Sequence, residues 1–173
     1  MPRMSHRIHA AAIAFALAGL VFTGVARADS EYERRTLAGL RGVHVVVHQP
    51  DPEAAENGLT LDALRLDVEE PLRAAGIAFL AEEESRATPG IPWLQLLVTL
   101  AKVEKKNLYA WSLRLVLLQR ACMERDPKIC ESCATWEVTR FGTVGSFQQK
   151  KIRADVRELA QKFADAYWTV NTR

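Results

Sequence analysis

The fold is decided by two consecutive apolar stretches, WLQLLVTLAKVE at residues 93–104 and YAWSLRLVLLQRAC at residues 109–122. In each stretch apolar and polar side chains alternate, which is the two-residue period of a strand with one buried face. When the two strands pair, their apolar rows must lie on the same face of the sheet, because a register slip of one residue would turn one of these rows toward solvent. We predict an antiparallel hairpin that turns at Lys106-Asn107 and sets Leu100 opposite Leu113.

Five further segments complete the expected order of elements, β-α-β-β-β-β-α. Strands are predicted at 42–48, 77–81 and 134–141. Apolar residues at helical spacing predict one helix from Thr60 to Gly76 and another from Ser146 onward. The first β-α-β unit implies a parallel pair, whereas the later strands pair as antiparallel hairpins. This order predicts an α+β fold, a two-layer sandwich with a mixed sheet of about five strands and two helices on one face.

The N-terminus has the three parts of an export signal. Arg3 and Arg7 precede an uncharged apolar run of about 15 residues, which ends at Ala26-Arg27-Ala28. This run is shorter than the roughly 20 residues that a membrane-spanning helix requires. We therefore predict a Sec-type signal peptide at 1–28, cleaved after Ala28, and a periplasmic or secreted protein without a remaining membrane span.

The residues after the predicted signal peptide divide into a lead and one domain. Residues 29–41 are rich in charge and are expected to be loosely ordered, whereas 42–173 are expected to form a single α+β domain. No cysteine directly follows the apolar run, so the sequence predicts no lipid anchor.

The charge of the chain changes when the signal peptide is removed. The full chain has 23 basic and 21 acidic residues, a net charge of +2. Residues 1–28 contain three arginines and no acid, so the remaining chain has a net charge of about −1. Such a chain has no overall basic field, and we expect no nucleic-acid partner.

No pattern in the sequence identifies a catalytic, cofactor-binding or metal-binding site. The two histidines outside the signal peptide, His44 and His48, are four residues apart on one strand, or about 13 Å, too far to share one metal ion. No serine lies in a nucleophile elbow, and no glycine-rich loop joins a strand to a helix. We expect no catalytic residue, no cofactor and no metal ligand.

Three cysteines lie close together near the predicted hairpin. Cys130 and Cys133 form a C-x-x-C pair, but a strand follows them instead of the helix N-terminus that would stabilise a reactive thiolate. Matching the apolar row of the strand at 134–141 to the row that contains Leu117 sets Cys122 opposite Cys133. We predict a Cys122–Cys133 disulfide and a free thiol at Cys130.

The opposite face of the predicted sheet is polar except at its centre. Leu97, Val116 and Leu118 form an apolar patch there, and such a patch can mark a docking surface. It can equally lie beneath the lead at 29–41, and this intramolecular cover is the favoured interpretation.

Several short motifs resemble an uncharacterised family of small secreted bacterial proteins. They are GVHVVV at 42–47, DVEEPLRAAGI at 67–77, and TW at 135–136 before a terminal helix that ends in YWTVN at 167–171. The element order is also similar to periplasmic α/β modules such as the TolB N-terminal domain and LpoB-type accessory proteins. This resemblance implies a binding or assembly role. LpoB-type proteins have a lipidation cysteine that this chain lacks.

Together these features predict a non-enzymatic periplasmic accessory module that binds another protein of the cell envelope. The alternative is a secreted enzyme, either one that exchanges thiols and disulfides or one whose site is assembled from distant residues.

Overall fold

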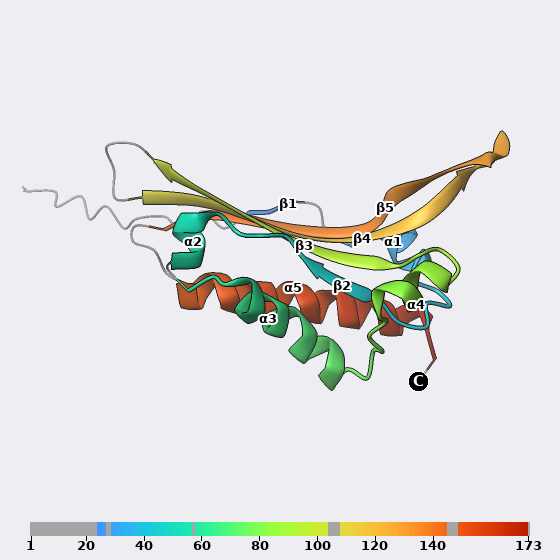
Figure 1. The fold of residues 1–173 in the computed structure, drawn as a ribbon, viewed down its shortest axis with the longest axis horizontal. Helices are drawn as coiled ribbons and strands as arrows, with labels where there is room; N and C mark the ends of the chain where they lie inside the picture. The colour runs from blue at the N-terminus through green and yellow to red at the C-terminus, as the bar shows by residue number, and fades with distance from the viewer. Residues whose placement is uncertain (1–23, 27–28, 57, 104–107, 145–148, 173) are drawn as a thin grey trace, which may run out of the picture.

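The structure has two layers, a sheet and a set of helices beneath it (Figure 1). It is a computed structural model that describes residues 24–26, 29–56, 58–103, 108–144 and 149–172. The strands follow the order β1-β5-β4-β3-β2 across the sheet, with β2 and β3 parallel and the other pairs antiparallel. The strands are β1 (Gly24–Ala26), β2 (His44–Val47), β3 (Trp93–Val103), β4 (Leu108–Met123) and β5 (Asp126–Val144). The expected α+β class is confirmed.

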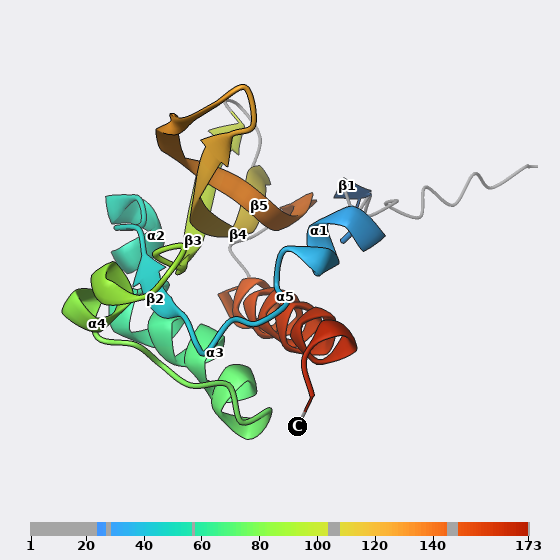
Figure 2. The same ribbon diagram turned by 90° about the vertical axis from the view of Figure 1, so that its right-hand side faces the viewer.

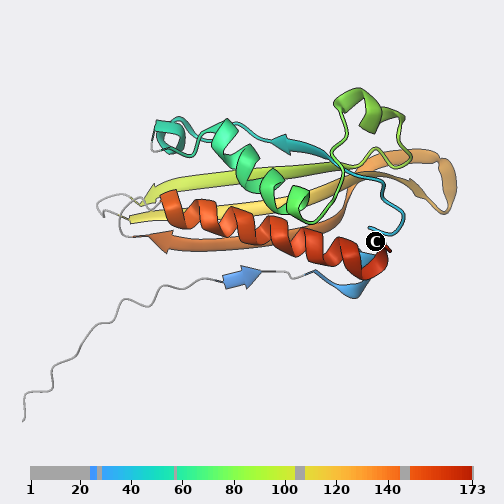
Figure 3. The same ribbon diagram turned by 90° about the horizontal axis from the view of Figure 1, so that it is seen from below.

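Two long helices cover one face of the sheet, side by side (Figure 3). In the described residues there are five helices: α1 (Glu31–Arg35), α2 (Pro52–Glu56), α3 (Leu61–Ala74), α4 (Glu82–Ala87) and α5 (Gln149–Val170). Helix α3 begins where the Thr60 side chain accepts a hydrogen bond from the Ala63 N–H, and it ends before Gly76, whose φ of 76° favours glycine. Both long helices turn an apolar stripe toward the sheet, formed by Leu64, Val68, Leu72, Ile152, Val156, Leu159 and Phe163.

The hairpin of β3 and β4 has the predicted faces but a different register. Its buried row contains the predicted residues, because Leu96, Leu113 and Leu115 are 0% exposed. Leu100, however, pairs with Trp111 and not with Leu113. A two-residue shift keeps every side chain on its face, so alternation alone does not distinguish the two registers. The turn that we placed at Lys106-Asn107 lies outside the described residues.

The strand that we predicted at 77–81 is reduced to one bridge, between Val43 and Phe79. The chain approaches β2 closely at this point, because a Cβ on Gly42 would lie 2.5 Å from the carbonyl oxygen of Ala78. The next helix, α4, starts at Glu82 and ends this extended segment. The parallel pair of the sheet is therefore β2 with β3, and the fifth strand is β1.

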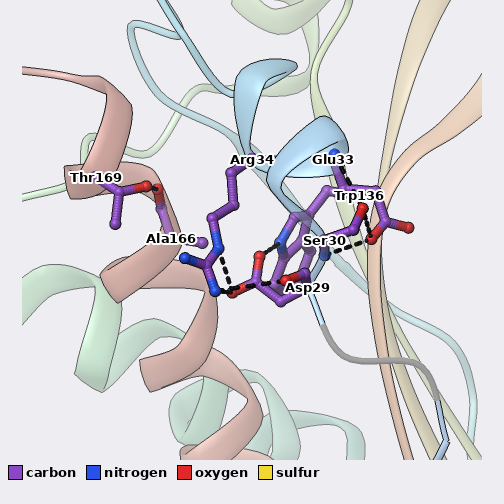
Figure 4. A network of polar contacts seen from close by, with 7 residues as sticks. All are labelled: Asp29, Ser30, Glu33, Arg34, Trp136, Ala166 and Thr169. Carbon is purple, nitrogen blue, oxygen red and sulfur yellow. Dashed lines mark hydrogen bonds and ion pairs between the residues drawn. The ribbon is translucent and has the colours of Figure 1, made fainter.

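The lead at 29–41 is ordered, which corrects our expectation of a loose segment. Helix α1 has a capping box in which Ser30 and Glu33 satisfy each other's backbone N–H groups. Asp29 accepts hydrogen bonds from Trp136 Nε1 at 2.9 Å and from Arg34 Nε at 2.8 Å (Figure 4). After α1, Leu37 and Leu40 pack in the hydrophobic core. The charged residues around these two leucines hid that contribution in the sequence.

Part of the predicted signal peptide lies in the sheet. Gly24–Ala26 form β1, which pairs with β5. The remaining residues of 1–28 lie outside the described part of the chain. Among the helices that the structure describes, none combines the length and apolarity needed to cross a bilayer.

Replacing Leu37 tests whether the lead belongs to the core. Leu37 is 0% exposed, so Leu37→Ala should lower the free energy of unfolding by about 3 kcal/mol through lost burial and a cavity. Tyr32, 80% exposed on the same segment, is the control, and Tyr32→Ala should change it by less than about 0.5 kcal/mol. Urea denaturation measures both. Equal, small effects would show that the lead is dispensable.

Candidate binding surface

The face of the sheet that points away from α3 and α5 has an apolar centre, as the sequence predicted. Leu97, Val116 and Leu118 lie there on β3 and β4. Val116 is only 2% exposed, whereas Leu97 and Leu118 are half-buried. The long helices α3 and α5 lie on the other side of the sheet (Figure 2), so the neighbouring side chains of the outer face must shield Val116. Leu97 and Leu118 are therefore the apolar groups that a partner could contact.

The lead at 29–41 does not cover this patch, contrary to the interpretation that we favoured. Helix α1 contacts α5 and β5. Just after it, the Thr36 carbonyl accepts a hydrogen bond from Gln119 Nε2 at 3.0 Å. Gln119 follows Leu118 directly on β4, so its side chain points to the helix side of the sheet. The lead thus packs on the opposite side, and the outer patch stays uncovered by it.

Polar contacts surround the apolar centre. Arg114 Nη2 and Glu137 Oε2 form an ion pair 2.5 Å apart across β4 and β5. On the other side, His48 Nε2 and Gln95 Oε1 are 2.9 Å apart. An apolar centre within a polar rim is the usual composition of a protein–protein interface.

The two histidines are engaged in contacts within the fold. His44 Nδ1 lies 3.0 Å from the Leu80 carbonyl oxygen, and its ring lies 5.5 Å from that of Trp93. Within the described residues, no three side chains of His, Cys, Asp or Glu come together as metal ligands.

A two-stranded ribbon extends this surface beyond the rest of the sheet (Figures 1 and 3). Strand β3 pairs with β4 only as far as Leu118, but β4 and β5 remain paired to Met123 and Asp126. Met123 and Ile129 are 37% and 43% exposed near its tip. A ribbon of two strands without a packed face is marginally stable by itself.

A disulfide between Cys122 and Cys130 closes the ribbon, so the predicted Cys122–Cys133 pairing is wrong. The prediction required Leu117 opposite Val138, but Leu117 pairs with Trp136, a shift of two residues, and a β-bulge at Thr135 adds a third. On its two sides, Leu117 pairs with Trp136 and Leu118 pairs with Ala134. The extra residue shifts the outer part of the ribbon by one position, and Cys122 then lies opposite Cys130.

The free thiol belongs to Cys133, not to Cys130 as we predicted. Cys133 is half-buried opposite Gln119 on β4. Cys130 and Cys133 are three residues apart on one strand, so their side chains point to opposite faces. Exchange within the C-x-x-C pair would require both sulfurs on one side, and this geometry does not favour the thiol-exchange alternative.

A shallow hollow of about 270 Å³ lies at the base of the ribbon, between Arg120, Trp93 and Arg86 of α4. The Arg86 guanidinium lies over the Trp93 ring, 5.3 Å from its centroid, and forms an ion pair with Glu82 at 2.6 Å. Arg86 lowers the pKa of the Glu82 carboxyl group, first through its hydrogen bond and second through its positive charge. Two arginine side chains therefore line the hollow, Arg86 and Arg120, and Arg86 is already paired with a carboxylate.

The backbone beside the hollow is strained. Ile91, which also lines it, has a φ of 47°, a conformation that a β-branched residue rarely adopts. The preceding carbonyl, of Gly90, accepts a hydrogen bond from the Arg120 N–H at 2.6 Å. This hydrogen bond connects the turn before β3 to β4 at the residue where the ribbon leaves the sheet. Sequence reasoning missed both features because no short motif marks them.

Comparison of the chain with protein-family models and with curated proteins finds no match.

Removing the disulfide should loosen the ribbon and leave the core intact. Closing a loop with a sequence separation of 8 contributes at most about 2.5 kcal/mol. In the double variant Cys122→Ser, Cys130→Ser, amide exchange should accelerate in residues 120–132, while the amides of α5 stay protected. Cys133→Ser, which breaks no disulfide, is the matched control and should leave the ribbon unchanged. Uniform acceleration across the domain would contradict this local role.

Proposed function

We propose that this protein is exported through a cleaved signal peptide and acts as a non-enzymatic accessory module that binds another protein of the cell envelope. The outer face of the sheet is the proposed docking surface. Periplasmic or secreted placement is supported by the N-terminal sequence pattern and by the disulfide, a bond typical of oxidising compartments.

One observation carries the proposal: the outer sheet face has an apolar centre and a polar rim, and α4 reaches it only at its margin, where Arg86 lies over Trp93. A two-layer fold with helices on one side leaves the other face to solvent. On a solvated face we would expect polar side chains throughout, but Leu97 and Leu118 interrupt them. The ribbon has two further exposed apolar side chains near its tip, Met123 and Ile129. A partner could contact the face and the ribbon together.

The docking surface is tested by charge substitutions at its centre. Leu97→Glu with Leu118→Glu should weaken binding to an identified partner by more than about tenfold, because each carboxylate would be desolvated in the interface. Val116 is avoided because its side chain is 2% exposed and a substitution there would disturb the fold. Leu66→Glu is the matched control, since Leu66 is 58% exposed on α3, on the other side of the molecule.

The measurement has two steps. Affinity capture from envelope extract with the processed chain identifies a partner, and titration calorimetry with the purified pair then gives the dissociation constant. Thermal unfolding confirms that each variant folds. If the double variant binds with the affinity of the parent, this face is not the docking surface.

A further inference from the structure

The two edges of the sheet are protected to very different degrees. At the β2 edge, the backbone of Val43 forms hydrogen bonds with Ala78 and Leu80, both at 3.0 Å. Next along this strand, the carbonyl of Val45 accepts a hydrogen bond from Arg65 Nη1 at 3.3 Å. Strand β2 is also only four residues long. Short strands and occupied backbone groups are usual ways of preventing further strands from pairing at an edge.

The β5 edge is occupied by β1. The pairs are Gly24 with Phe141, Val25 with Arg140, and Ala26 with Thr139. Figure 3 shows β1 as the outermost strand beside β5. Closer to the start of β5, before Trp136, the Thr135 carbonyl accepts a hydrogen bond from Thr36 Oγ1 at 3.1 Å. In the described part of the chain, β1 is thus the only strand on the outward side of residues 139–141.

The predicted cleavage after Ala28 separates β1 from the rest of the protein. The backbone groups of 139–141 that face outward then lose their partner. This part of β5 has no proline, no lysine and no bulge, which are three common protective features of an edge, because the bulge lies outside residues 136–144 at Thr135. Phe141 is moreover 43% exposed. Such an edge is a template for an added strand.

We propose that the processed protein binds an extended, uncharged segment of its envelope partner as an additional antiparallel strand along residues 139–141 of β5. This inference rests on the proposed export and cleavage, and it specifies how the partner of the proposed function is held. In the uncleaved chain, β1 occupies the same edge, so the site becomes available only when the signal peptide is removed.

The surroundings of the edge define the chemistry of the added segment. Arg140 points to the helix side, where it forms ion pairs with Asp155 at 2.5 Å and Glu158 at 2.6 Å. Its charge is already compensated, so an uncharged residue fits opposite it. Phe141 points to the outer face, and an apolar or β-branched residue opposite it would gain a favourable cross-strand contact. A second copy of this chain, paired symmetrically about Arg140, would instead set two arginines opposite each other.

The test uses the processed chain, residues 29–173, and a synthetic peptide of residues 20–28 as the probe. Hydrogen exchange of the free chain should be fast at the outward-facing amides of 139–141. Adding the peptide at millimolar concentration should slow exchange there by at least about tenfold. A peptide with Ala26→Pro, which lacks the backbone donor opposite Thr139, should give no protection.

Variants of the processed chain locate the effect. Phe141→Lys should weaken peptide binding by about tenfold, because lysine on an edge opposes strand addition. Leu66→Lys is the matched control, since Leu66 is an exposed apolar residue on α3 and should leave peptide binding unchanged. No protection by the peptide, equal protection by the proline peptide, or equal binding by Phe141→Lys would each overturn the proposal.

Two further outcomes separate this inference from the docking surface. If 139–141 are protected without peptide and the chain sediments as a dimer, a second copy occupies the edge and the proposed partner strand is wrong. If the partner's affinity depends on Leu97 and Leu118 but not on Phe141, the outer face is the docking surface and strand addition is excluded. Loss of affinity in Phe141→Lys alone would support the edge and reject the outer face.

Discussion

The packing of α5 against one face of the sheet is the interaction on which the rest of the structure depends. Trp136 of β5 and Phe163 of α5 are both fully buried, with ring centroids 5.1 Å apart in an edge-to-face arrangement. Because the helices lie on one side only, each long strand has one buried row and one solvated row. The uncovered outer face, the open edge of β5 and the projecting ribbon all result from this one-sided arrangement.

A buried carboxylate fixes how the two long helices lie together. Asp67 of α3 is 2% exposed and accepts hydrogen bonds from Arg153 at 2.6 Å and from Arg157. Both arginines come from the polar side of α5, and their partly exposed guanidinium groups keep some contact with water. A charged residue buried in this way must be paired, so the cluster makes the α3–α5 contact specific. Alternation and helical spacing in the sequence do not reveal such a pairing.

The sequence predicts which residues are buried better than it predicts which residues meet. Alternation correctly assigned the faces of β3 and β4, because a one-residue error would expose a whole row. It does not detect a two-residue shift, which is why Leu100 lies opposite Trp111 and not Leu113. The bulge at Thr135 has no local signal either. Together with a two-residue shift in the pairing of β4 with β5, this extra residue changes the disulfide partner of Cys122 from Cys133 to Cys130. Alternation alone was enough to place Leu97 and Leu118 on the candidate surface. The cysteine pairing in the ribbon, in contrast, could be predicted only from the exact register of β4 and β5.

The anchoring of Asp29 has a consequence for the lifetime of the protein. Its carboxylate is held by both Trp136 and Arg34, and Asp29 is the residue that follows the predicted cleavage site. Chain ends are attacked by proteases mainly where they are loose. A chain that starts at Asp29 has no loose residues in front of this anchor. Trimming by aminopeptidases would therefore require the lead to detach from the core first, so the stability of the lead would set the rate of degradation from this end.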